Sequence, residues 1–257
     1  MKPDKRKHFL RTSDLARAVG VHVNTVRLYE KWGLIPKAER SPSGYRRFTP
    51  YHLDCMRLAR MVYAAPYPGR PIRRSGLNII TRVTAGDLGG ALELVYQHKA
   101  LVQAELAQAE SAIALLERWA GGAPADATGK ALQSGQTARL LGVTSDVLRN
   151  WERNGLITVP RNPDNRYRRY GPQEIGRLRV IRMLSRAGYS TMAILRMLTL
   201  LDSGQTEGLR DALDTPRADE DIFSASDRWL STLEEWGQRT EEMITHLERM
   251  IAKGSNL

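Results

Sequence analysis

The segment GVHVNTVRLYEKWGLI, residues 20–35, recurs as GVTSDVLRNWERNGLI, residues 142–157, with a constant offset of 122 positions and no gap. The match extends upstream, where Leu10 and Ala16 correspond to Leu132 and Ala138, and downstream, where YRRF at 45–48 corresponds to YRRY at 167–170. Similarity at a fixed spacing indicates repeated structural units. The chain therefore carries two copies of one module.

Each copy predicts a winged helix-turn-helix. In the first copy, Thr12 or Ser13 is expected to cap a helix, Gly20 to form the turn, and a second helix over 23–32 to end at Gly33. Two helices joined by a short turn form the helix-turn-helix, whose second helix enters the major groove of DNA.

The segment after these helices predicts a hairpin and a further helix. Residues 34–35 and 45–48 are prone to β structure and flank the turn-rich segment 40–44, so we expect a β-hairpin wing that carries arginines. Thr49 and Pro50 then provide a cap and a proline suited to the first helical position.

Both copies resemble the N-terminal DNA-binding domain of the MerR family of bacterial transcription regulators. The resemblance covers about 45 residues each time, and it joins a turn glycine, an aromatic-Glu pair, Gly-Leu-Ile and a Tyr-Arg-x-aromatic wing. It implies a mainly α fold with two tandem winged helix-turn-helix domains, each followed by a long coiled-coil helix. The second copy departs from the pattern at Arg166, which replaces Gly44, and at Asn150, which precedes the aromatic-Glu pair.

The chain is divided accordingly into five segments. Apolar residues on a 3-4 spacing, interrupted at Lys99 in one helix and at Thr240 in the other, predict two association helices. We expect the first DNA-binding domain over 8–84, an association helix over 85–120, a linker over 121–131, the second DNA-binding domain over 132–205, and a second association helix with a tail over 206–257.

Charge is distributed unevenly along the chain, whose formal net charge is +11. Residues 1–74 carry 17 Lys and Arg against 5 Asp and Glu, and residues 132–186 carry 11 against 4. Residues 207–251 carry only 5 against 12. Basic modules with an acidic last segment predict one surface for DNA and another for protein.

Candidate DNA-contacting residues lie early on the second helix of each copy and on the wings. Arg46 and Arg168 are expected to neutralise phosphates, whereas Tyr29 and Trp151 are expected either to contact the DNA backbone or to lie partly in the core. The contrast of Asn24-Thr25 with Ser145-Asp146 predicts an operator with two distinguishable halves. The full set is Asn24, Thr25, Arg27, Tyr29, Tyr45, Arg46 and Arg47, with Ser145, Asp146, Arg149, Trp151, Arg166, Tyr167 and Arg168.

The resemblance implies a transcription regulator that binds double-stranded promoter DNA and activates by distorting the spacer read by the RNA polymerase holoenzyme. A simple repressor or an architectural DNA-binding protein is an alternative. Another is a protein that binds or sequesters a small hydrophobic or aromatic molecule such as an antibiotic. Its pocket would be formed by Tyr96, Trp119, Trp229 and Trp236. These positions lie on or beside the seam, the apolar stripe through which the association helices are expected to pack, and this favours a core role.

In the MerR family, two subunits pair through antiparallel helices that follow the DNA-binding domain. A linker of about ten residues spans at most roughly 35 Å, enough to join the end of one such helix to a second DNA-binding domain. We therefore predict a monomeric pseudo-dimer, with a homodimer of four DNA-binding modules as the alternative.

Several other classes of protein are disfavoured. Cys55 is the only cysteine, so we expect no intrachain disulfide and no CxxC metal site. We expect Cys55 to be a small, buried apolar residue of the core. The five histidines are scattered without catalytic or metal-binding spacing, and there is no phosphate-binding glycine loop, so neither an enzyme nor a cofactor is predicted. No signal peptide or membrane-spanning run is present, which predicts a cytoplasmic protein without a membrane partner.

Overall fold

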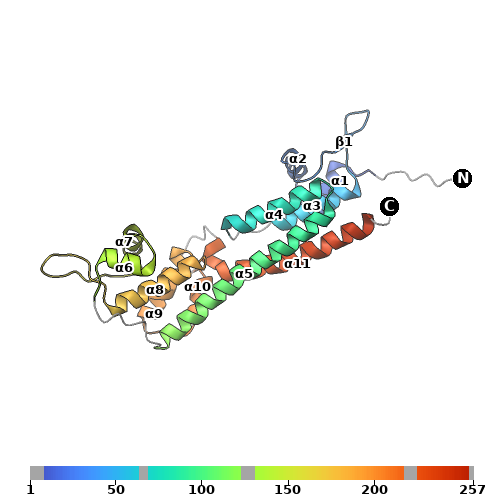
Figure 1. Ribbon diagram of the computed structural model, residues 1–257. Helices are drawn as coiled ribbons and strands as arrows, with labels where there is room; N and C mark the ends of the chain where they lie inside the picture. The colour runs from blue at the N-terminus through green and yellow to red at the C-terminus, as the bar shows by residue number, and fades with distance from the viewer. Residues whose placement is uncertain (1–8, 64–68, 123–130, 217–224, 255–257) are drawn as a thin grey trace. The chain divides into compact units, whose positions relative to one another are not determined.

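The computed structural model describes residues 9–63, 69–122, 131–216 and 225–254. They fold into two compact units, one of residues 1–103 with 235–257 and the other of residues 104–234. The described elements are helices apart from one two-stranded sheet and isolated bridges, which confirms the mainly α fold class (Figure 1).

The first unit begins with the helix-turn-helix and wing. Gly20, at φ +67°, allows the turn between the first two helices. Asp14 caps the first helix by accepting a hydrogen bond from the Arg11 amide at 2.8 Å, so the expected Thr12 or Ser13 cap is replaced. The elements are α1 Thr12–Ala18, α2 Val23–Lys31, β1 Glu39–Arg40, β2 Arg46–Arg47, α3 Pro50–Tyr63, α4 Gly69–Thr84, the first half of α5 Leu88–Ala120 and most of α11 Trp229–Gly254.

The second unit repeats this plan. Helix α7 begins 122 positions after α2, and both helices have nine residues. The elements are α6 Ser134–Leu141, α7 Ser145–Arg153, α8 Pro172–Arg186, α9 Thr191–Asp202, α10 Leu209–Asp214 and the 3-10 helix η1 Ala225–Arg228, with the second half of α5 and the start of α11.

The second strand of the wing lies within the expected run 45–48, but the first strand is formed by other residues than expected. Strand β1 pairs antiparallel with β2, whereas Leu34 and Ile35, predicted as a β-prone run, are buried in the core. Their side chains are apolar and lie directly after α2, so burial stabilises them more than an exposed hairpin would. In the described part of the second copy, the wing closes through the single bridge of Arg161 with Arg168.

Helix α11 completes the core of the first unit. Met243, Leu247 and Met250 are buried together with Ala91 and Val95 of α5. The Asp54 carbonyl on α3 accepts a hydrogen bond from His246 Nε2 at 2.9 Å, and Lys253 Nζ lies 2.9 Å from Asp54 Oδ2. The last helix of the chain is therefore packed against the DNA-binding domain nearest the first residue.

The seam of α5 in this unit differs from the prediction. His98 is completely buried, with its ring centroid 5.8 Å from that of Trp236, whereas Lys99 reaches Glu241 at 2.5 Å. Burial lowers the pKa of His98 to about 4. Thr240 is buried with its hydroxyl donating to the Trp236 carbonyl, so it belongs to the seam that it was expected to interrupt.

The region before α11 was only partly anticipated. Helix α11 begins at Trp229, whereas the sequence placed the second association helix within 206–257 and did not distinguish α10, whose Leu209 and Leu213 are buried. Trp229 packs over Gly188, where an added Cβ would lie 2.5 Å from the indole ring. Residues 123–130 of the expected linker lie outside the described residues.

Candidate nucleic-acid interface

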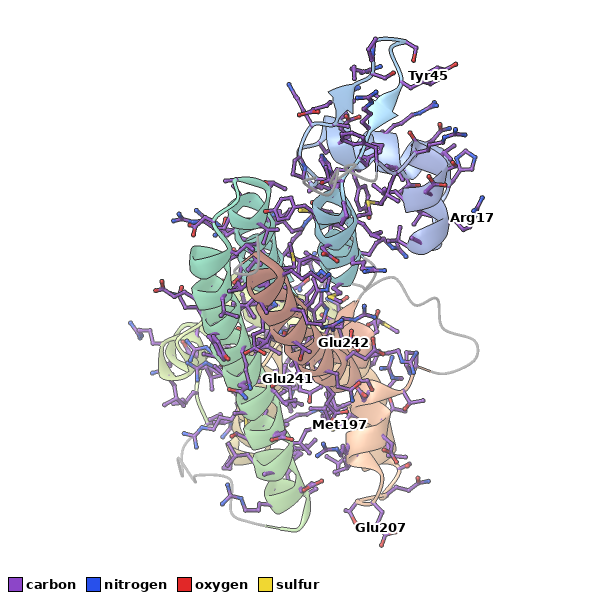
Figure 2. All side chains as sticks on the ribbon, turned by 90° about the vertical axis from the view of Figure 1, so that its right-hand side faces the viewer. Arg17, Tyr45, Met197, Glu207, Glu241 and Glu242 are labelled. Atoms are coloured by element: carbon purple, nitrogen blue, oxygen red, sulfur yellow. The ribbon has the colours of Figure 1, made fainter. Side chains whose placement is uncertain are left out.

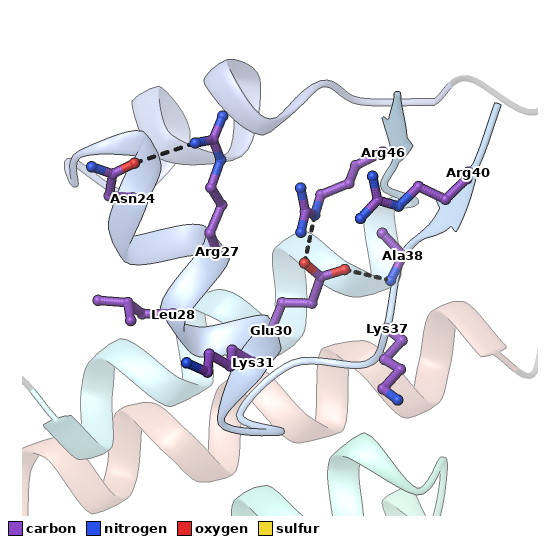
Figure 3. A pocket seen from close by; sticks show the side chains of 9 residues that line it. All are labelled: Asn24, Arg27, Leu28, Glu30, Lys31, Lys37, Ala38, Arg40 and Arg46. Carbon is purple, nitrogen blue, oxygen red and sulfur yellow. Dashed lines mark hydrogen bonds and ion pairs between the residues drawn. The ribbon is translucent and has the colours of Figure 1, made fainter. Parts of the chain in front are cut away.

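One face of α2 and the wing form a basic groove in the first copy. Asn24, Arg27, Leu28 and Lys31 recur at positions i, i+3, i+4 and i+7, which places them on one face of the helix. We call these four residues the recognition stripe. This stripe lines a groove of about 850 Å³. The other lining residues are Glu30, Lys37, Ala38, Arg40 and Arg46 (Figure 3).

Glu30 ties the recognition helix to the wing. Its Oε2 accepts a 2.6 Å hydrogen bond from Arg46 Nε, and its Oε1 accepts one from the Ala38 amide at 3.1 Å (Figure 3). The Glu30 side chain is 10% exposed and that of Arg46 26%, so the pair is screened less than a surface ion pair. Arg46, predicted as a phosphate contact, therefore also fixes the angle of the wing.

The second copy repeats this arrangement. Arg168 Nε donates to Glu152 Oε2 at 2.6 Å, and Arg161 Nη2 lies 3.7 Å from Glu152 Oε1. We refer to each of the pairs Glu30–Arg46 and Glu152–Arg168 as a Glu–Arg clasp. A groove of about 350 Å³ in this copy is lined by Gln133, Ser134, Gly135, Arg149, Arg161, Arg166, Tyr167 and Arg168. Its counterpart in the first copy is a separate groove that contains Arg11, Arg27, Tyr45 and Arg46, not the groove that contains Lys31 and Lys37.

The two recognition helices present different chemistry at matching positions. The offset of 122 places Asp146 at the position of Asn24 and Val147 at that of Thr25. The counterpart of Asn24-Thr25 is therefore Asp146-Val147 and not the expected Ser145-Asp146, which lies one residue earlier. Arg149 Nη1 donates to Asp146 Oδ1 at 2.9 Å, whereas Arg27 Nη1 meets the neutral amide oxygen of Asn24 at 3.4 Å. The first recognition stripe is consequently the more electropositive.

The wing tips present aromatic side chains to solvent. Tyr45 is 76% exposed and Tyr167 65%, and Figure 2 shows Tyr45 projecting from the end of the wing. Arg166 adopts φ +62° where Gly44 has φ +81°, so the second wing turns in the same left-handed conformation with a charged side chain. The guanidinium of Arg47 lies over the Phe9 ring, 5.0 Å from its centroid.

Two of the aromatic candidates lie in the core. Tyr29 and Trp151 are both buried, and the Tyr29 ring is 6.0 Å from that of Tyr63 on α3. Of the two roles considered for these residues, the structure supports core packing. Thr25 and Ser145 are half-buried near the beginning of their helices, whereas Asn24, Arg27, Asp146 and Arg149 are exposed.

The four aromatic residues considered for an effector pocket divide between the units. Tyr96 and Trp236 belong to the first unit, where Trp236 is completely buried and Tyr96 is 49% exposed. Trp119 and Trp229 belong to the second unit, where Trp229 is buried against Gly188 and Trp119 is half-buried. Trp229 and Trp236 therefore have the core role that the spacing favoured.

The remaining candidate chemistry is limited. Cys55 is buried, and burial raises the pKa of its thiol to about 12, which keeps it protonated at neutral pH. No group of three or more His, Cys, Asp or Glu residues suited to a metal ion is found in the described part of the chain. Within the same residues, no helix is long and apolar enough to cross a membrane.

Sequence reasoning missed the Glu–Arg clasps and two lysines of the groove. Lys31 and Lys37 line the first groove and have no ion-pair partner among the described residues. The clasps had a signal in the sequence, because Glu30 and Arg46 recur at the same offset as Glu152 and Arg168. Only the fold brings residues 16 positions apart within hydrogen-bonding distance.

Duplicated recognition helices with attached wings and basic grooves define a protein with tandem winged helix-turn-helix modules. Comparison with family models gives "MerR family regulatory protein" over residues 11–48 and "MerR HTH family regulatory protein" over residues 132–201. The chain is 30% identical over 118 residues to the mercuric resistance operon regulatory protein of Bacillus cereus, covering 46% of this chain and 77% of that protein. The chain belongs to the MerR family.

Other relatives match over shorter stretches or with lower identity. The mercuric resistance operon regulatory protein of Pseudomonas fluorescens is 33% identical over 76 residues, 30% of this chain and 53% of that protein. The HTH-type transcriptional regulator CueR of Escherichia coli O6:H1 is 28% identical over 115 residues, 45% of this chain and 75% of that protein. The chain thus spans about half the length of several curated relatives it matches. No solved structure matches it significantly.

Proposed function

We propose that the protein is a sequence-specific regulator of transcription that binds double-stranded promoter DNA with both modules of a single chain. The observation that carries this proposal is the duplicated recognition helix, which in both copies is held to an arginine-bearing wing by a Glu–Arg clasp. Rigid attachment matters because a wing fixed relative to its helix contacts the duplex without a further loss of conformational entropy.

Different residues of each groove are assigned different parts of the duplex. Asn24, Arg27, Asp146 and Arg149 are exposed near the beginning of their helices, where side chains reach base edges in the major groove. Lys31, Lys37 and Arg40 supply the positive charge expected for phosphate contacts. On the wings, Tyr45, Arg46 and Arg47 and, in the second copy, Arg166, Tyr167 and Arg168 remain assigned to the DNA backbone.

The packing of α11 supports a single-chain pseudo-dimer. The first unit draws its core from α3, α5 and α11, which is the packing we expect if α11 of the same chain takes the role of a partner's association helix. Hydrogen bonds and ion pairs from His246, Lys253 and Glu241 support this intrachain packing. The α11 helix of a second chain could take this position only by displacing these contacts.

We further propose activation by DNA distortion, with RNA polymerase holoenzyme as the partner at the promoter. This mechanism requires two recognition surfaces held at a set separation, so that binding free energy is available to bend or untwist the spacer between half-sites. The names of relatives as regulatory proteins of operons support this role. A thiolate-bound metal is not proposed as effector, because the single cysteine is buried.

Light scattering with DNA footprinting tests this function. The purified protein should have a mass near 28.9 kDa alone and should protect one operator as one chain. A stable mass of twice that value, in dilute solution and on DNA, would contradict the single-chain arrangement and leave DNA binding intact. Absence of any protected site on promoter DNA would overturn the proposed regulator itself.

A further inference from the structure

A further basic groove lies in the first unit and is lined by no residue of the recognition helix or the wing. It has a volume of about 410 Å³, which is within the range of small-molecule sites. Its lining comes from the end of α1, from α3 and from α11, and it shares no residue with the DNA-facing groove beside the wing. The residues are Ala18, Val19, Arg57, Arg60, Met61, His246 and Arg249.

Positive charge in this groove is only partly compensated. Asp54 Oδ1 lies 3.3 Å from Arg57 Nη1, but the other oxygen of the same carboxylate is engaged by Lys253 at 2.9 Å. Arg60 and Arg249 form no hydrogen bond or ion pair with any other described residue. Two of the three arginines that line the groove therefore have no ion-pair partner, and their guanidinium groups offer planar, multidentate donors to an oxyanion.

His246 provides a second feature suited to an anion. Its side chain is buried, and Nε2 carries the proton that it donates to the Asp54 carbonyl. Burial is the main cause that lowers the pKa of His246, the Asp54 carbonyl and carboxylate oppose the shift, and the charges of Arg249 and Arg57 lower the pKa further. An anion between these arginines would cancel their effect, and protonation of Nδ1 would then add a donor.

We propose that this groove binds a small phosphate-type dianion through Arg57, Arg60 and Arg249, with His246 as a proton-dependent fourth partner. The site is formed from both ends of the chain, because α3 belongs to the first copy and α11 follows the second. Occupancy would therefore strengthen the attachment of α11 to the first DNA-binding domain, since a ligand stabilises the state that binds it.

The second copy does not reproduce the groove. Arg57 and Arg60 recur as Arg179 and Arg182, but Gly176 replaces Asp54 and lacks the carboxylate that engages Arg57 and Lys253. Arg182 packs close to Gly142, 3.4 Å from the position of an added Cβ. The repeat therefore predicts one anion site per chain.

Isothermal titration of the full chain with inorganic phosphate and with pyrophosphate, in low-salt buffer, tests this site. We expect one saturable site, and we expect Arg60→Gln and Arg249→Gln each to weaken it by about tenfold or more, because each removes charge-assisted hydrogen bonds. Both side chains lack protein partners, so the variants should retain the fold. Arg118→Gln removes the same charge from an exposed position of α5 in the other unit and should leave the affinity unchanged.

A DNA-binding arm distinguishes a free anion from a backbone phosphate. If DNA supplies the phosphate, neither free anion saturates the site, but both pocket variants lower the slope of log affinity against log salt by about one. The proposal is overturned if Arg60→Gln and Arg249→Gln match both the wild type and Arg118→Gln in their affinity for free anion and in the salt slope of DNA binding. Saturable binding of free phosphate supports the site even if no promoter DNA is bound.

Sulfate provides the test of His246, because the charge of sulfate, unlike that of phosphate, does not change near neutral pH. Sulfate affinity should rise as pH falls from 7.5 to 5.5, since the bound anion favours the protonated imidazole. Arg249→Gln should weaken binding at every pH. A sulfate affinity that is independent of pH would remove His246 from the site.

Discussion

Arg166 keeps the left-handed backbone conformation of the wing turn, although the first copy has glycine at this position. It is the one residue other than glycine with positive φ among the described positions, and it occupies the wing turn that Gly44 forms in the first copy. The Asn162 carbonyl accepts a hydrogen bond from the Arg166 amide at 2.9 Å and holds the turn in place. Such a conformation costs an L-residue with a Cβ about 1–2 kcal/mol.

This cost can be measured with paired substitutions. Gly44→Ala should lower the free energy of unfolding by about 1 kcal/mol, whereas Arg166→Ala should leave it nearly unchanged because the strain is already present. Arg166→Gly should not destabilise the second wing, since relief of strain offsets the added freedom of the unfolded chain. Urea unfolding of the three variants checks these values, and a large loss for Arg166→Ala would show that its side chain is structural.

The Glu–Arg clasps predict that two basic residues of one groove behave differently. Lys37→Gln should reduce the slope of log affinity for DNA against log salt concentration by about one, because the Lys37 side chain has no ion-pair partner in the described structure. Arg46→Gln should lower affinity by loosening the wing while changing the slope less, because Glu30 already neutralises much of that charge. Fluorescence anisotropy at several salt concentrations separates the two, and equal slopes for both variants would contradict the distinction.

At the scale of the helices, His98 is a titratable residue in the mainly apolar seam between α5 and α11. Neither ring nitrogen has a hydrogen-bond partner among the described residues, and the ring lies edge-on to Trp236. A buried, unpaired imidazole resists protonation, which is the physical cause of its lowered pKa. The α5–α11 packing in the first unit therefore depends on a neutral histidine.

Acid should weaken this packing. The folded pKa of about 4 lies below the ordinary 6.5, so the unfolded chain binds more protons between these values and stability falls as pH drops from 6.5 to 4. The shift sets an upper bound of about 3 kcal/mol on this loss. His98→Leu should abolish that part of the pH dependence, and the exposed control Tyr96→Leu should retain it. Urea unfolding at pH 7 and pH 4.5 measures the difference, and identical pH profiles for His98→Leu and wild type would refute this role.

At the scale of the whole molecule, two unlike modules on one chain allow an asymmetric operator. The first recognition stripe is Asn24, Arg27, Leu28 and Lys31, and its counterpart is Asp146, Arg149, Asn150 and Arg153. Leu28 suits a thymine methyl group, whereas Asn150 suits adenine and Asp146 disfavours phosphate while accepting from cytosine. A homodimer of identical modules would instead favour a symmetric site.

Selection of bound sites from random DNA tests this asymmetry. The wild type should select an imperfect inverted repeat with distinguishable halves, and the variant Asn24→Asp with Leu28→Asn should select halves that are more alike. Arg118→Gln, which lies outside both grooves, should select the wild-type site. A perfect inverted repeat selected by the wild type would contradict the proposed division between modules.

The sequence by itself determined the tandem modules, because their helices depend on local signals. Turn glycines and apolar spacing predicted α1, α2 and α3, and the repeat predicted that α6, α7 and α8 recur in the second copy. The pairing of β1 was misplaced, since two-residue strands have little pattern of their own and Leu34 and Ile35 are β-prone whether buried or paired.

Only the tertiary structure decided which distant side chains meet. A 3-4 apolar spacing cannot distinguish His98 from Lys99 as the seam residue, because both lie near the same face and the partner helix selects between them. The Glu–Arg clasps and the groove around His246 join residues from 16 to nearly 200 positions apart. Local propensity carries no information about such contacts, which depend on how α3, α5 and α11 pack into one core.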